Sequence, residues 1–159
     1  MLELCARPYS TLDAGAGAGM PLEGTPGEPA TILVVEDDPA LRALLLELLR
    51  GEDYRVLVAG EGRRGLEFAR QHCPHAILLD IGPPGVSGWA VLQQLSASGR
   101  TRHIPVVALT GRSELAADAG GQAPDACVAK PFDISTLLEH LARAVQSGRH
   151  ARRVGDRVS

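Results

Sequence analysis

Long apolar runs are missing from this sequence, and aromatic residues are scarce. No stretch approaches about 18 consecutive apolar residues, so the sequence predicts no transmembrane span. The N-terminus also lacks a basic region followed by an apolar run, so no signal peptide is expected. Aromatic residues make up 3% of the 159 residues, whereas apolar residues make up 45%. The sequence therefore predicts one domain with an aliphatic core.

Neither the net charge nor the cysteines point to a nucleic-acid binder or a zinc protein. The net charge is −3, without the basic excess that nucleic-acid binding favours. The three cysteines, Cys5, Cys73 and Cys127, form no Cys-x-x-Cys pair and no metal-binding spacing. An odd cysteine count favours a reducing compartment, and we expect a cytoplasmic protein.

Composition divides the chain into three parts. Residues 1–30 are rich in Gly, Pro and Ala and have no hydrophobic period, which predicts a disordered leader. Residues 31–146 carry regular apolar patterns and form the expected domain. Residues 147–159 are polar and basic, and we expect a flexible tail there.

Apolar strands and amphipathic helices alternate through residues 31–146. Asp38 suits a helix N-cap and Pro39 the first helical position. Strands that are apolar throughout must be covered on both faces, which predicts a doubly wound, five-stranded parallel sheet with helices on each side. The expected strands are 31–35, 54–59, 75–80, 104–110 and 126–129, and the expected helices are 39–51, 62–71, 88–97, a weak one at 113–119, and one that Asp133 caps.

Polar residues follow several of these strands where the strands end. Glu36, Asp37 and Asp38 follow the first strand, and Asp80, Thr110 and Lys130 stand at the ends of the third, fourth and fifth. In an open parallel sheet these groups converge at one edge. Clustered carboxylates repel one another unless a cation lies among them, and oxygen ligands favour Mg²⁺ over zinc. A hydroxyl and an ammonium beside them indicate phosphoryl chemistry.

Lys130 is the single lysine among 16 basic residues. A compact ammonium on a flexible stem suits one phosphoryl oxygen better than a planar guanidinium does. Its position at a strand end therefore strengthens the phosphoryl interpretation.

Four motifs in this order resemble those of a response-regulator receiver domain of two-component signalling. They are "ILVVEDDP", "ILLDIGPPGVSG", "IPVVALTG" and "VAKPFD", and the resemblance covers about residues 31–146. It implies a flavodoxin-like fold and a stand-alone signalling domain that is not an enzyme beyond Mg²⁺-dependent self-phosphorylation and autodephosphorylation. The implied partners are a sensor histidine kinase or phosphotransfer protein and an unknown downstream protein. The missing apolar span and the net charge favour neither a membrane nor a nucleic acid as a partner.

The resemblance also implies roles for individual residues. Asp80 is the implied phosphoacceptor, and Thr110 and Lys130 contact the phosphoryl group. Pro84 restricts the loop behind the acceptor, and a cis bond before Pro131 orients the lysine. The implied Mg²⁺ ligands are Asp37, Glu36 through water, Asp80 and the carbonyl of Gly82.

Three departures from the family matter, and the third is that Thr110 to Lys130 spans only 20 residues, which predicts a short fourth helix. Gly82 replaces a larger side chain, which leaves a phosphoryl group less shielded from water. Cys127 stands where most receivers carry Tyr or Phe, and we expect it to be a small buried strand residue. Cys127, together with the short helix expected between Thr110 and Lys130, leaves a phosphate-independent pseudo-receiver as one alternative. The glycine motif "GEGRRG" at 60–65 offers another, a dinucleotide-binding domain.

Overall fold

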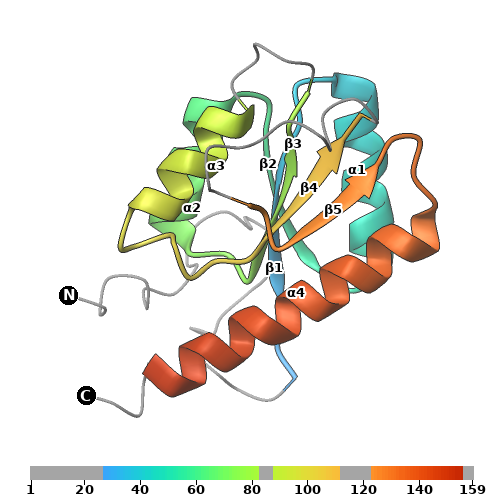
Figure 1. The fold of residues 1–159 in the computed structure, drawn as a ribbon. Coiled ribbons are helices and arrows are strands. Elements are labelled where there is room, and N and C mark those ends of the chain that lie inside the picture. Colours follow the sequence, from blue (N-terminus) through green and yellow to red (C-terminus); the bar gives the residue numbers. More distant parts are fainter. Residues whose placement is uncertain (1–26, 83–87, 112–122, 156–159) are drawn as a thin grey trace.

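The computed structural model describes residues 27–82, 88–111 and 123–155, and within them five parallel strands form one sheet in the order β2-β1-β3-β4-β5 (Figure 1). This confirms the expected doubly wound class, and the switch point lies between β1 and β3. The helix expected over 113–119, together with Pro84, lies outside the described residues. The strands are β1 (Thr31–Val35), β2 (Arg55–Ala59), β3 (Ala76–Asp80), β4 (Val106–Thr110) and β5 (Ala126–Ala129), and the helices are α1 (Pro39–Gly51), α2 (Gly62–His72), α3 (Gly88–Ala97) and α4 (Ile134–Gly155).

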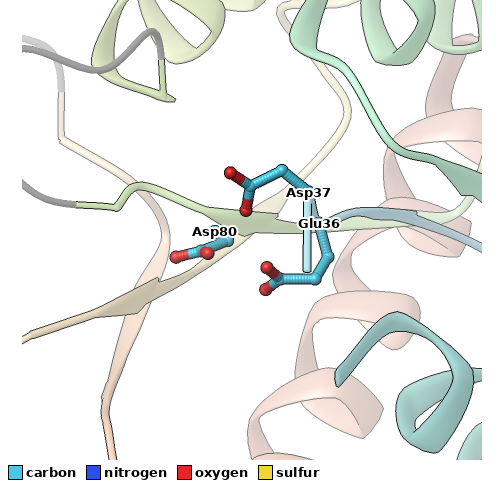
Figure 2. A group of neighbouring side chains, drawn as sticks. All are labelled: Glu36, Asp37 and Asp80. Atoms are coloured by element: carbon cyan, nitrogen blue, oxygen red, sulfur yellow. The ribbon is translucent and has the colours of Figure 1, made fainter. Parts of the chain in front are cut away.

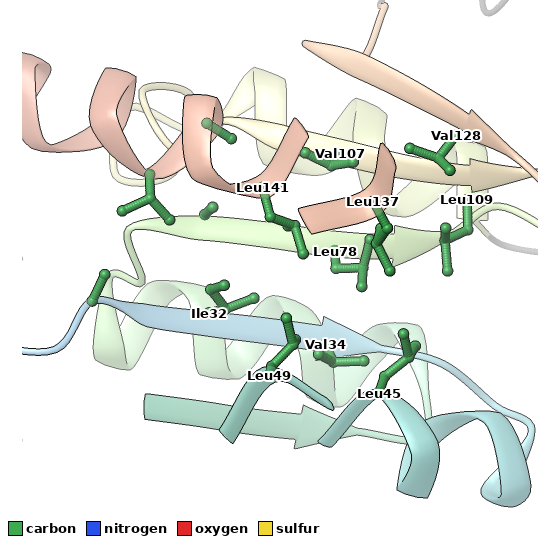
Figure 3. Close-up of a cluster of buried hydrophobic side chains, with 14 residues drawn as sticks. Ile32, Val34, Leu45, Leu49, Leu78, Val107, Leu109, Val128, Leu137 and Leu141 are labelled. Atoms are coloured by element: carbon green, nitrogen blue, oxygen red, sulfur yellow. The ribbon is translucent and has the colours of Figure 1, made fainter. Parts of the chain in front are cut away.

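Two aliphatic cores lie on opposite faces of the sheet. Successive strand residues point to opposite faces, so Ile32 and Val34 pack under α1 and α4, whereas Leu33 and Val35 pack under α2 and α3. Figure 3 shows the first core, in which leucines of α1 and α4 meet the sheet. Both faces of the central strands are covered, which is why these strands are apolar throughout.

The start of α1 follows from its sequence. Asp38 has an extended backbone, and its Oδ1 accepts hydrogen bonds from the amides of Ala40 at 2.9 Å and Leu41 at 3.5 Å. Pro39 occupies the first turn, where its missing N–H loses nothing. The predicted cap and both predicted ends of this helix are confirmed. The helix therefore begins directly behind the acidic residues at the end of β1.

The C-terminal helix differs from the expectation. α4 continues to Gly155, past residue 147 where we expected a tail to begin. Gly148 is buried, and a Cβ there would overlap the carbonyl oxygen of His75. The absence of a side chain at Gly148 permits close packing of this helix against the chain entering β3. Contact with the sheet thus overrides the low helix propensity of glycine.

Other differences concern burial. Ala30, placed in the expected leader, is 3% exposed and belongs to the first core. Leu44 and Ile134 follow the helical pattern, yet they are 53% and 48% exposed. Cys127 is exposed rather than buried, because β5 is an edge strand and its neighbour Val128 is the residue that points into the core. Among the described residues, no helix is long and apolar enough to cross a membrane.

Candidate functional site

Three carboxylates meet at the carboxyl edge of the sheet. Glu36 and Asp37 directly follow β1, and Asp80 ends the neighbouring β3. One oxygen from each lies within 4.8 Å of the others, and Figure 2 shows the three side chains turned toward a common space. The adjacency of β1 and β3 therefore brings together acids that lie more than 40 residues apart in the chain.

Glu36 is the most buried member of this cluster. Its side chain is 1% exposed, and its Oε1 accepts a hydrogen bond from the amide of Asp38 at 3.1 Å. Burial raises the pKa of Glu36 to about 8, the proximity of Asp80 adds to the rise, and the Asp38 amide and the Lys130 charge oppose it. Oε2 has no hydrogen-bond partner among the described residues. This oxygen is therefore available to bind a cation.

Lys130 pairs with the predicted acceptor. Its Nζ lies 2.9 Å from Oδ2 of Asp80 and 3.8 Å from Oε2 of Glu36. The peptide bond between Lys130 and Pro131 is cis, as expected. The ammonium therefore already sits at the carboxylate where a transferred phosphoryl group would need a counter-charge.

Thr110 ends β4 beside this ion pair. The residue is 1% exposed, and its Oγ1 has no hydrogen-bond partner among the described residues. Its own carbonyl accepts a hydrogen bond from the amide of Lys130 at 2.7 Å, which ties the ends of β4 and β5 together. Leaving a buried hydroxyl without a hydrogen bond is unfavourable. The Thr110 hydroxyl is therefore available to donate a hydrogen bond to a group that enters the site.

The turn after Asp80 explains the glycine at position 82. Gly82 has a φ of 68°, in the left-handed region that glycine adopts most readily, and its amide donates to Oδ1 of Asp80 at 3.0 Å. Gly88, the last residue of the motif "ILLDIGPPGVSG", also shapes this turn through a contact that the motif does not predict: a Cβ at Gly88 would overlap the backbone of Ile81. The start of α3 thus packs directly on the residue that follows the predicted acceptor.

The donor set fits a hard divalent cation. Three carboxylates stand within reach of one point, one of them with a buried oxygen that accepts no hydrogen bond, and among the described residues no nitrogen or sulfur ligand joins the group. Oxygen-only ligation of this kind suits Mg²⁺. The residues predicted from sequence as metal ligands, Glu36, Asp37, Asp80 and Gly82, therefore lie together, with Gly82 in the turn that follows Asp80.

The glycine motif at 60–65 has a packing explanation. A Cβ at Gly65 would approach Cγ2 of Val35 to 2.7 Å, so this glycine lets α2 lie close to β1. A Cβ at Gly60 would approach the guanidinium of Arg42 to the same distance. Close packing of α2 accounts for Gly65, and the Arg42 guanidinium of α1 accounts for Gly60, so neither glycine needs a dinucleotide phosphate to explain it.

Comparison with known proteins gives the family. Residues 32–142 match the response regulator receiver domain. The chain belongs to this family. The receiver is therefore a phosphoacceptor domain of two-component signalling, and it is a signalling domain rather than a classical enzyme. The pseudo-receiver alternative is not favoured.

Curated relatives include proteins of very different length. Protein PilH of Pseudomonas aeruginosa is 34% identical over 121 residues, which cover 75% of this chain and 99% of PilH. The polar-differentiation response regulator DivK of Brucella anthropi is 32% identical, with 70% of this chain and 92% of DivK covered. Histidine kinase P4 of Formosa agariphila is 37% identical, but the matching region covers 69% of this chain and only 8% of that kinase.

Solved structures agree with this assignment. A putative response regulator from Chloroflexus aurantiacus has a TM-score of 0.67 at 28% identity, covering 74% of this chain and 98% of that one. The receiver domain of the sensor histidine kinase PA1611 from Pseudomonas aeruginosa has a TM-score of 0.66 at 27% identity, with coverage of 74% and 98%. That structure has a magnesium ion coordinated in its active site cleft.

Proposed function

We propose that Asp80 accepts a phosphoryl group from the phosphohistidine of a histidine kinase or phosphotransfer protein in the cytoplasm. The observation that carries this proposal is the 2.9 Å pairing of Lys130 Nζ with Asp80 Oδ2 inside the carboxylate cluster. In the transfer, an oxygen of Asp80 forms a bond to phosphorus while the bond from phosphorus to the donor imidazole breaks. The imidazole leaves with the electron pair of that bond.

The residues around Asp80 have separate proposed roles in binding the metal ion and the phosphoryl group. Glu36, Asp37, Asp80 and the Gly82 carbonyl would hold Mg²⁺, which when bound neutralises charge on the phosphoryl oxygens. Lys130 exchanges its contact with the carboxylate for one with a phosphoryl oxygen, and Thr110 donates its hydroxyl to another. Pro84 and Pro131 are proposed to hold the two loops that frame the site.

The output that we propose is a contact with a downstream protein. Movement of Thr110 and Lys130 toward the phosphoryl group would alter the ends of β4 and β5, which are already joined by a backbone hydrogen bond. A partner that distinguishes the two states would read that change.

A phosphodonor experiment tests the proposal. With acetyl phosphate and Mg²⁺, the intact mass should increase by one phosphoryl group, whereas Asp80→Asn should remain unmodified. Asp53→Asn is the matched control, because Asp53 is exposed, lies outside the site and has a φ of 61° that asparagine tolerates. A wild-type chain that stays unmodified while a known receiver is labelled would refute the proposal and favour a phosphate-independent module.

A further inference from the structure

Arg42 makes an unusual contact from α1 back to the acidic loop. Its Nη1 donates a hydrogen bond of 3.0 Å to the backbone carbonyl of Glu36, six residues earlier. The amide of Glu36 in turn donates to the carbonyl of Ala59, at 3.0 Å. The peptide groups on both sides of Glu36 are therefore fixed, one by β2 and one by the guanidinium.

Gly60 provides the space for this contact. A Cβ at position 60 would lie 2.7 Å from Nη1 of Arg42 and 3.5 Å from Cζ. Among the described glycines, Gly27 and Gly82 have a positive φ, and Gly60 does not. A side chain at position 60 would therefore displace the guanidinium from its seat, whereas the backbone conformation of Gly60 does not itself demand glycine.

The contact acts on the loop that supplies two of the proposed metal ligands. The carbonyl that Arg42 binds belongs to the peptide joining Glu36 to Asp37, so the guanidinium fixes the plane of that peptide. The plane of a peptide sets the direction of the side chain that follows it, here the exposed Asp37 carboxylate.

We propose that Arg42, seated against Gly60, is a positioning residue that orients Asp37 and so sets the affinity of the site for Mg²⁺. This inference rests on the proposed function, since it concerns the same cation site. It also assigns the first glycine of the 60–65 motif a role, which is to admit a guanidinium. Partners that orient metal ligands typically change metal affinity by about 10- to 100-fold when removed.

A double-mutant cycle on Mg²⁺ binding, measured by calorimetry without a phosphodonor, tests the proposal. Arg42→Gln should weaken binding by about tenfold, at the lower end of the range for such partners. Gly60→Ala should weaken it in the same direction by displacing the guanidinium. In the double variant, Gly60→Ala should add nothing, because its effect passes through Arg42.

Matched controls separate positioning from general damage. Arg50→Gln removes an equal charge from the exposed last turn of α1, and Gly99→Ala adds a methyl group in open space. Both should bind Mg²⁺ like the wild type. The metal-free melting temperature of Gly60→Ala should stay close to that of the wild type, because the added methyl group meets only the end of a flexible side chain.

The outcomes distinguish this inference from the proposed function. A wild-type chain that binds no Mg²⁺ refutes the proposed function. Wild-type binding that Arg42→Gln changes by less than twofold overturns only the positioning role. The positioning role is also overturned if the fold-changes in Mg²⁺ affinity caused by Arg42→Gln and by Gly60→Ala multiply in the double variant.

Discussion

At the scale of single residues, Glu36 shows burial and like charge acting together. Burial first, and then the neighbouring Asp80, raise the pKa of its carboxyl to about 8 from an ordinary value of 4.5. Between those values the folded chain holds a proton that the unfolded chain has released. The contribution of the protonated Glu36 carboxyl to metal-free stability is therefore fully present below about pH 4.5 and is lost as the pH rises through 8.

This linkage gives a pH prediction. Without Mg²⁺, Glu36 should lower the free energy of unfolding as the pH rises from 5 to 8, by at most about 1.4 kcal/mol per pH unit. Urea unfolding of the wild type and Glu36→Gln across this range measures it as a difference between the two slopes. Parallel pH profiles would show that Glu36 is ionised in the folded chain throughout.

Asp37 gives a second prediction at this scale. It is exposed and lies within 4.8 Å of two other carboxylates, so removing it relieves repulsion while deleting a proposed metal ligand. Asp37→Ala should lose Mg²⁺-dependent phosphorylation and match or exceed the metal-free stability of the wild type, by up to about 1 kcal/mol. Mass spectrometry and thermal unfolding measure the two effects. A large fall in melting temperature would contradict the assignment of Asp37 to function rather than to folding.

At the scale of elements, the sequence predicts starts better than ends. Asp38 and Pro39 act within a few residues, so the start of α1 is readable from local chemistry. Gly148 is ambiguous, because glycine marks both helix ends and places of close packing, and only contact with the chain before β3 decides between them. Gly60 is ambiguous in the same way, since its reason for being glycine is an arginine 18 residues earlier.

The candidate site, too, is predictable from sequence where local chemistry and strand order decide and not where packing decides. Glu36, Asp37, Asp80, Thr110 and Lys130 could be placed together because strand ends in a parallel sheet converge once the strand order is known. The sequence gives no indication that Glu36 Oε2 and Thr110 Oγ1 are buried without hydrogen-bond partners among the described residues, or that Gly82 has a positive φ. Such features depend on which atoms surround a side chain, and composition does not encode that directly.

The packing of α4 leads to a prediction for this element. Gly148→Ala raises helix propensity by about 1 kcal/mol, but its methyl group would overlap the His75 carbonyl, and such overpacking typically costs about 1–3 kcal/mol. We therefore expect a net loss of stability in urea unfolding. Gly51→Ala is the control, because that glycine ends α1 in open space. A variant at 148 as stable as the wild type would mean that α4 does not pack closely on His75.

At the scale of the whole molecule, one sheet both supports two cores and gathers the site at a single edge. The buried residues of β1 and β3 belong to both cores, while the residues that follow them carry the acids. The metal-free fold therefore keeps a cluster of three carboxyl groups at the end of its most buried strands. A cation that binds only the folded chain should stabilise the entire domain.

The size and pH dependence of this stabilisation form the last prediction. At a Mg²⁺ concentration of about 100 times the dissociation constant, linkage gives about 2.7 kcal/mol, a shift of several degrees in melting temperature. The shift should be larger at pH 8 than at pH 6, because at the lower pH Mg²⁺ must displace the proton that a carboxyl with a pKa of about 8 retains. Thermal unfolding with and without Mg²⁺ measures it at both pH values, with Asp37→Ala as the variant that should lose the shift. If Asp37→Ala shows the same Mg²⁺-dependent shift in melting temperature as the wild type, the stabilising cation binds elsewhere on the molecule. If the wild-type shift is the same at pH 6 and pH 8, Glu36 is not one of the ligands of the cation.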